Sequence, residues 1–200
     1  MKNVLPFVLL STLLLLTSLV PAVAQDFLFG VKGGLNVSTL GGSGGGNANA
    51  RAGFHLGGYV IAPLSERIAL QAEIVYSQQG YRNPPIFVNA FNVAYDYINV
   101  PIIGKIYASD NFNVQVGPQI GFLISSDVGS TRTVDAGVVL GIGYDMDSGL
   151  NFAARYNLGL TNVNAFAPNA LTNFTLANRV FQLSVGYTLR ARGTGGKTKR

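Results

Sequence analysis

The chain has 200 residues, of which 48% are hydrophobic and only 12% are charged, and it contains no cysteine. A typical soluble domain carries about 25% charged residues, so this balance argues against an ordinary soluble protein. Without cysteine, disulfides and thiol chemistry are excluded. The net charge of +5 has a local origin, because five cations lie in the last eleven residues. The remaining chain is close to neutral and does not indicate a nucleic-acid-binding surface.

The N-terminus has the pattern of an export signal. Lys2 precedes a Leu-rich apolar run over 4–20, and Ala22-Val23-Ala24 supplies the small residues of a cleavage site. We predict a signal peptide over 1–24, cleaved between Ala24 and Gln25. An uncleaved membrane anchor is the alternative, although the run is marginal for a span of ~20 residues. No later window is long and apolar enough, so we expect no transmembrane helix in the mature chain.

Eight stretches of the mature chain alternate apolar and polar residues. The clearest is FQLSVGYTL at 181–189, where odd positions are apolar and even positions are small or polar. This alternation predicts strands with one apolar face. In chain order, the predicted strands span 27–38, 51–62, 67–79, 95–107, 112–124, 133–146, 150–161 and 181–189. The fourth is the least regular, and we expect a bulge at Pro101 because proline cannot donate a ladder hydrogen bond.

The connections between these strands alternate in length. Short turns lie at 63–66, 108–111 and 147–149, and longer loops lie at 40–50, 80–94, 125–132 and 162–178. This rhythm is typical of bacterial outer-membrane barrels, in which short turns face the periplasm and long loops face outside. We therefore predict an all-β fold, an eight-stranded antiparallel up-and-down transmembrane β-barrel over 25–190. A basic, flexible tail follows at 191–200, and both termini are expected in the periplasm.

Aromatic residues gather near the predicted strand ends, as in the interfacial girdles of membrane barrels. The candidates on the short-turn side are Phe29, Tyr107, Phe112, Tyr144, Phe152 and Tyr187, and those on the other side are Phe54, Tyr76, Tyr95 and Phe181. A soluble eight-stranded barrel is the alternative. The polar face, however, carries mostly Gly, Asn, Gln and Ser, which suits a narrow lumen better than a surface in water.

The alternation also places charged residues inside the barrel, namely Lys32, Arg51, Glu73, Lys105, Asp135, Asp145 and Arg155. Unpaired charges in a narrow interior are costly, so we expect a network of Lys32, Glu73, Lys105, Asp135 and Arg155. At its centre, Glu73 faces Lys32, Lys105 or Arg155. A structural plug is the favoured interpretation, and a gate or ion path is the alternative.

No residue pattern indicates catalysis. His55 is the one histidine and is predicted to face the lumen, and the chain has no G-x-S-x-G motif. A histidine pair and an acidic cluster with calcium-loop spacing are also absent from the sequence. We therefore predict no catalytic residue, no cofactor and no metal site.

Several segments resemble a known family. The chain reads FGVKGGLNVSTL at 29–40, YINVPI at 97–102, GPQIG at 117–121 and VGYTL at 185–189. They are similar to the PorT-type outer-membrane β-barrel proteins of Bacteroidetes, whose first strand has the form G-x-K-x-G-x-N-x-S. The resemblance implies an eight-stranded barrel of the OmpA or OmpX build and brings no catalytic residues. The namesake takes part in protein secretion and gliding.

One departure from the family is the tail, because such barrels usually end on the last strand, which the insertion machinery reads. We interpret the chain as a structural or adaptor protein of the outer membrane. Its expected partners are membrane lipid, the barrel-insertion machinery and a periplasmic or secretion-complex protein, with no nucleic acid. A narrow channel is one alternative function, and a lipid-modifying enzyme that uses His55 is the other.

Overall fold

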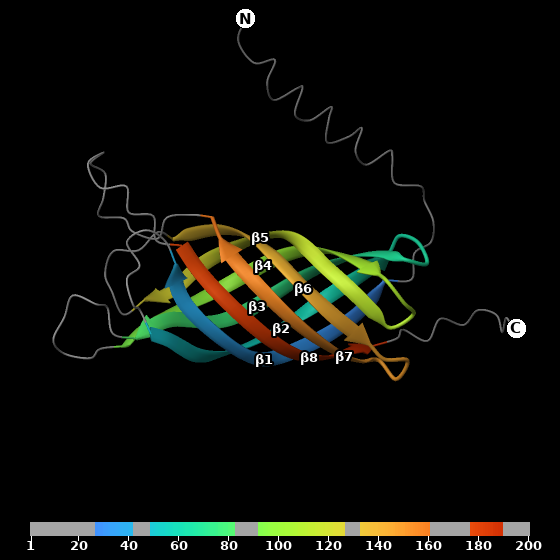
Figure 1. The fold of residues 1–200 in the computed structure, drawn as a ribbon, viewed down its shortest axis with the longest axis horizontal. Helices are drawn as coiled ribbons and strands as arrows, with labels where there is room; N and C mark the ends of the chain where they lie inside the picture. Colours follow the sequence, from blue (N-terminus) through green and yellow to red (C-terminus); the bar gives the residue numbers. More distant parts are fainter. Residues whose placement is uncertain (1–26, 42–48, 83–91, 127–132, 161–176, 190–200) are drawn as a thin grey trace, which may run out of the picture.

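The computed structural model describes residues 27–41, 49–82, 92–126, 133–160 and 177–189. These residues form eight antiparallel strands that close into one barrel, as the sequence predicts (Figure 1). Each strand pairs with its neighbours in the chain, and the first also pairs with the last, so no sheet edge remains. The strands are β1 (Leu28–Gly41), β2 (Asn49–Pro63), β3 (Ile68–Arg82), β4 (Asn92–Tyr107), β5 (Phe112–Ser126), β6 (Val134–Asp145), β7 (Leu150–Gly159) and β8 (Ala177–Leu189).

Two predicted segments lie outside the described residues. These are the signal peptide over 1–24, with its cleavage site at Ala24 and Gln25, and the tail over 191–200. Within the described part of the chain, no helix is long and apolar enough to cross a membrane.

The alternation of residue types separates the two faces of the barrel wall. Large apolar side chains point outward, and Leu35, Leu56 and Ile74 are more than 60% exposed. Polar side chains point inward, and 17 of the described polar or charged residues are buried. This is the reverse of a soluble protein, and it follows from the period of two in a β-strand.

The first residue of β1, the last of β8 and three short turns lie at the same end of the barrel (Figure 1). The turns are closed by backbone hydrogen bonds from Leu64 to Ile68, from Ala108 to Phe112 and from Met146 to Leu150. Gly149 has a φ of +91°, which glycine adopts without the steric cost that a side chain would add. The predicted hairpin at 147–149 is thereby confirmed.

At the opposite end, six strands extend further than the sequence predicts, so the long connections are shorter than expected. These strands are β1, β2, β3, β4, β5 and β8. About half of their additional residues are polar, yet they remain in the ladder, with Arg82 paired to Asn92 and Thr39 to Arg179. Backbone pairing does not require an apolar face, which is why hydrophobic periodicity made these strands too short.

Two further predictions about β4 are wrong. The register is unchanged on both sides of Pro101, and the irregularity between β4 and β5 lies at Asp96 and Tyr97 instead. Tyr107 and Tyr95 do not belong to the aromatic girdles, because both lie on the inward face with Lys105. The Tyr107 hydroxyl donates to Asp145 inside the barrel, and Tyr95 is buried beside Tyr97.

The interior also holds two apolar groups. Tyr59, Ile61 and Ala69 cluster near the short-turn end, with Leu28 and Tyr107 packed against them. Tyr95 and Tyr97 cluster in the other half, with Tyr81 and Leu123.

Candidate functional site

The most heavily charged part of the lumen is a group that we call the ionic layer, made of Lys32, Gln71, Glu73, Gln115 and Arg155. Strands β1, β3, β5 and β7 supply these side chains, because each presents its polar face inward. All five are at least 95% buried. Distant parts of the chain therefore meet at one level of the barrel.

Glu73 is the centre of the ionic layer. Its Oε2 lies 2.9 Å from Nζ of Lys32, and its Oε1 lies 2.8 Å from a terminal nitrogen of Arg155. Gln71 donates to Oε1 at 2.6 Å, and Nε of Arg155 donates to Oε1 of Gln115 at 2.6 Å. Each charge has an opposite partner, and Glu73 and Arg155 each have a further contact with a glutamine, which helps a buried interior to tolerate these charges.

Glycine makes space for this arrangement. A methyl group at Gly141 would lie 2.8 Å from Cγ of Arg155 and 2.6 Å from the carbonyl oxygen of Ala154. Both distances are below normal contact, so a side chain at Gly141 would displace the arginine or the strand. The glycine-rich inner face predicted from the sequence thus has a specific steric role here.

A second group, the amide layer, contains Asn36, His55, Ser77, Gln182 and Ser184. Oδ1 of Asn36 lies 2.7 Å from Nδ1 of His55 and accepts from Gln182 at 3.1 Å. Nδ2 of Asn36 donates to the Ser77 hydroxyl at 3.0 Å and to the carbonyl oxygens of Phe54 and Gln78. Asn36 thus connects several strands through one fully satisfied amide.

His55 lies between the Asn36 amide and the Ser184 hydroxyl, in the arrangement of a proton relay. Since Oδ1 of Asn36 can only accept, Nδ1 of His55 carries the proton, and Nε2 of the neutral ring accepts from the Ser184 hydroxyl at 2.8 Å. Serine, histidine and an orienting acceptor in this order resemble a nucleophilic triad. His55 is only 1% exposed, however, and Ser184 is 6% exposed. The sequence analysis missed both partners of His55.

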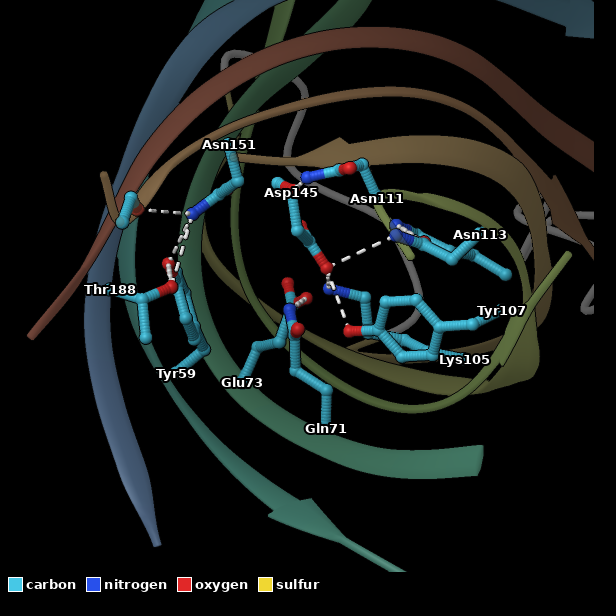
Figure 2. Close-up of polar contacts among 12 residues, drawn as sticks. Tyr59, Gln71, Glu73, Lys105, Tyr107, Asn111, Asn113, Asp145, Asn151 and Thr188 are labelled. Carbon is cyan, nitrogen blue, oxygen red and sulfur yellow. Dashed lines mark hydrogen bonds and ion pairs between the residues drawn. The ribbon is translucent and has the colours of Figure 1, made fainter. Parts of the chain in front are cut away.

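A third group surrounds Asp145 toward the short-turn end (Figure 2). One carboxylate oxygen, Oδ2, accepts from Lys105 at 2.6 Å, from the Tyr107 hydroxyl at 2.8 Å and from Asn113 at 3.1 Å. Nearby, Asn151 donates to the Tyr59 hydroxyl at 2.7 Å. Lys105 therefore pairs with Asp145 and not with Glu73.

Asp135 lies in the other half of the lumen. It accepts from Asn178 at 3.4 Å and borders a small space together with Gln79, Gln119 and Asn157. Arg51 donates to the backbone carbonyl of Gln79 in the same half. Of the five residues predicted to form one network, the structure brings Lys32, Glu73 and Arg155 together and places Lys105 and Asp135 in separate groups.

The sequence analysis missed the neutral members of these groups, such as Gln71, Gln115 and Asn113. These neutral residues occupy inward-facing positions of the alternating pattern, just as the charged residues do, but they carry no charge that would mark them as candidates. Little free volume remains around the charged side chains, with a cavity of about 10 Å³ between them, which is room for roughly one water molecule. In the described residues, no group of three or more His, Asp or Glu side chains has the arrangement of a metal site.

A closed antiparallel barrel with an apolar outer face and a packed polar lumen defines a transmembrane β-barrel. In agreement, the family model for the outer membrane protein β-barrel domain matches residues 23–165. The chain belongs to this family, and its place is the outer membrane.

Solved structures with the same fold include two bacterial proteins. Neisserial surface protein A (NspA) is 16% identical with a TM-score of 0.55, and the match covers 80% of this chain and 97% of that chain. Ail, the attachment invasion locus protein of Yersinia pestis, solved with the heparin analogue sucrose octasulfate, is 12% identical with a TM-score of 0.51. That match covers 82% of this chain and 99% of Ail. No curated protein matches the sequence.

Proposed function

We propose that this barrel is a closed outer-membrane scaffold that acts through its two ends, as an adaptor or surface-interaction protein, and does not conduct solutes. The observation that carries the proposal is the filled lumen. Tyr59 and its apolar neighbours occupy the short-turn half, the ionic layer follows, and Tyr95 and Tyr97 occupy the other half. Among the described residues the spaces around the charged side chains hold about 10 Å³ each, which supports a lumen without a continuous path for a hydrated ion.

Single-channel recording in planar bilayers tests the closed lumen. The wild-type barrel is expected to give no reproducible conductance, because opening a path requires breaking the buried ion pairs of Glu73. A variant with Lys32→Ala, Glu73→Ala and Arg155→Ala, checked for folding by heat-modifiable gel migration, is the matched comparison. Clear and reproducible conductance of the wild type would instead establish the narrow channel.

The barrel is oriented with its short turns and both termini in the periplasm. The lengths of the connections support this orientation. Since the chain contains no cysteine, single-cysteine variants test it directly. An impermeant maleimide should label Ser126→Cys at the end of β5 on intact cells, and Ser109→Cys in a short turn only after the outer membrane is permeabilised. The opposite labelling pattern would reverse the orientation.

We further propose that the barrel lies beside secretion machinery. The resemblance to PorT-type proteins supports this role. Loss of the protein from its own cells should then reduce the amount of secreted protein, and re-expression should restore it. Unchanged secretion, with the barrel shown to be absent, would leave a purely structural or adhesive role.

A hydrolytic activity is the alternative that the Ser184–His55–Asn36 relay favours. The burial of all three residues argues against it, because a substrate carbonyl has no space beside the Ser184 hydroxyl. A fluorophosphonate that labels activated serines should therefore leave the folded protein unmodified. Labelling at Ser184, abolished by His55→Ala, would establish an enzyme.

A further inference from the structure

A cavity of about 280 Å³ opens at the short-turn end of the barrel. Its floor is apolar and includes Leu28, Ile61, Ala69 and Tyr107, all of which belong to the apolar group around Tyr59. Its wall includes Thr188, the second-to-last residue of β8. We call this space the mouth cavity.

Acidic side chains surround the mouth cavity. Glu66, Asp110 and Asp147 all line it, and each comes from a different short turn. The three residues are exposed, and none of them is in an ion pair with another described residue. Arg67 is the one cation on these turns. Three hairpins thus hold a net negative charge around a single opening.

The chain itself supplies the complementary charge at this place. After Leu189 the sequence continues with Arg190, Arg192, Lys197, Lys199 and Arg200 and contains no acidic residue. The last strand ends at the cavity wall, where the Thr188 amide donates to the Gly149 carbonyl at 2.8 Å. The basic segment is therefore attached to the strand that ends at the cavity wall.

The tail is long enough to cross the opening. Eleven extended residues reach about 36 Å, at about 3.3 Å per residue. An eight-stranded barrel is roughly 16 Å wide, given a strand spacing of about 4.8 Å and a tilt of about 40°. A tethered segment binds at a high effective concentration, so modest individual ion pairs suffice.

We propose that residues 190–200 bind in the mouth cavity, with their cations on its acidic rim of Glu66, Asp110 and Asp147. The apolar stems of the arginine and lysine side chains cover the apolar floor while their charged groups meet the rim. This inference does not depend on the barrel's role as an adaptor or a channel.

A disulfide trapping experiment tests the proposal, since the natural chain has no cysteine. Ser65→Cys places a thiol in the cavity lining, and Thr198→Cys places one between Lys197 and Lys199. The folded full-length protein in zwitterionic detergent is oxidised mildly at low salt. The matched variant adds Glu66→Gln, Asp110→Asn and Asp147→Asn, which keep the shape of the rim and remove its charge.

The Ser65→Cys and Thr198→Cys variant with the acidic rim should form the disulfide about tenfold faster than the same variant with the neutral rim, as expected for three exposed ion pairs together. The difference should vanish at about 1 M salt, where the screening length is about 3 Å. The pair Ser126→Cys and Thr198→Cys, with one thiol at the opposite end, gives the background rate. Heat-modifiable gel migration confirms that each variant is folded.

Equal rates for the acidic and neutral rims would overturn the proposal. It would also be overturned if trapping fell to the background rate in vesicles with anionic lipid but not in zwitterionic vesicles, because the tail would then bind headgroups in a membrane. Trapping that persists in both kinds of vesicle supports docking at the rim.

Discussion

The ionic layer and the amide layer are two neighbouring parts of the same lumen, and they solve the burial of polar groups differently. They touch in the sheet itself, where Arg155 of β7 pairs in register with Gln182 of β8. The ionic layer pairs opposite charges, with two cations, Lys32 and Arg155, bound to the one carboxylate of Glu73. The amide layer contains no charged side chain, so its burial requires only that each hydrogen-bond donor is paired with an acceptor. The two layers should therefore respond differently when one member is removed.

The largest effect is expected from Glu73→Gln, which keeps the shape of the side chain and leaves Lys32 and Arg155 without their counter-charge. Breaking a buried ion pair from one side costs about 3–5 kcal/mol. The free energy of unfolding, measured by far-UV circular dichroism in urea with the folded fraction checked on a gel, should fall by this amount. The exposed control Arg67→Gln should stay within about 0.5 kcal/mol of wild type.

Adding Lys32→Met to Glu73→Gln removes one of the two stranded cations, so part of the lost stability should return. This second variant separates charge balance from packing. If Glu73→Gln unfolds at the same urea concentration as wild type, the ionic layer does not stabilise the barrel.

A smaller effect is expected from Asn36→Ala in the amide layer. The substitution removes the partner of the His55 ring and of Ser77 and Gln182, but it leaves no uncompensated charge. Buried groups that lose a neutral partner cost about 1–3 kcal/mol. The same urea titration measures it, with Arg67→Gln in an exposed turn as the control. A loss as large as that of Glu73→Gln would mean that charge is not what distinguishes the two layers.

The sequence predicts which face each of these residues takes, but not the level at which it lies. Parity along one strand is a local property, so Lys32, Glu73 and Arg155 could each be placed inside the barrel. Whether β3 brings Glu73 opposite Arg155 of β7 depends on the register of every strand pair between them, which closure of the barrel sets. Asp135 shows the consequence, since it has the predicted parity but lies near Asn178 in the other half.

The two aromatic residues that were predicted on the wrong face also show how strongly parity determines orientation. Tyr95 and Tyr107 were assigned to girdles because they lie near strand ends, whereas parity alone would have placed them inside with Lys105. In a barrel wall made of a single sheet, the odd or even position of a residue along its strand sets whether its side chain faces the lumen or the outside, whatever the residue type. The strand ends near the long connections were missed because their pairing is made by the backbone, which leaves no hydrophobic signal.

The smallest effect is expected from Lys105→Met, which tests whether the contrast between the layers is one of charge or of burial. Like Glu73, Asp145 binds a lysine, but its side chain is 26% exposed, while that of Glu73 is fully buried. After the substitution Asp145 keeps the Tyr107 hydroxyl and the Asn113 amide and is reached by water. The loss should be about 1 kcal/mol, as for an exposed ion pair.

Lys32→Met, the buried counterpart, should cost roughly 1.5–3 kcal/mol as a buried charged hydrogen bond. Equal losses for the two lysines in the urea titration would show that solvent at the mouth does not screen the Lys105–Asp145 pair. The mouth would then be as dry as the ionic layer, because only exclusion of water gives an ion pair its full strength.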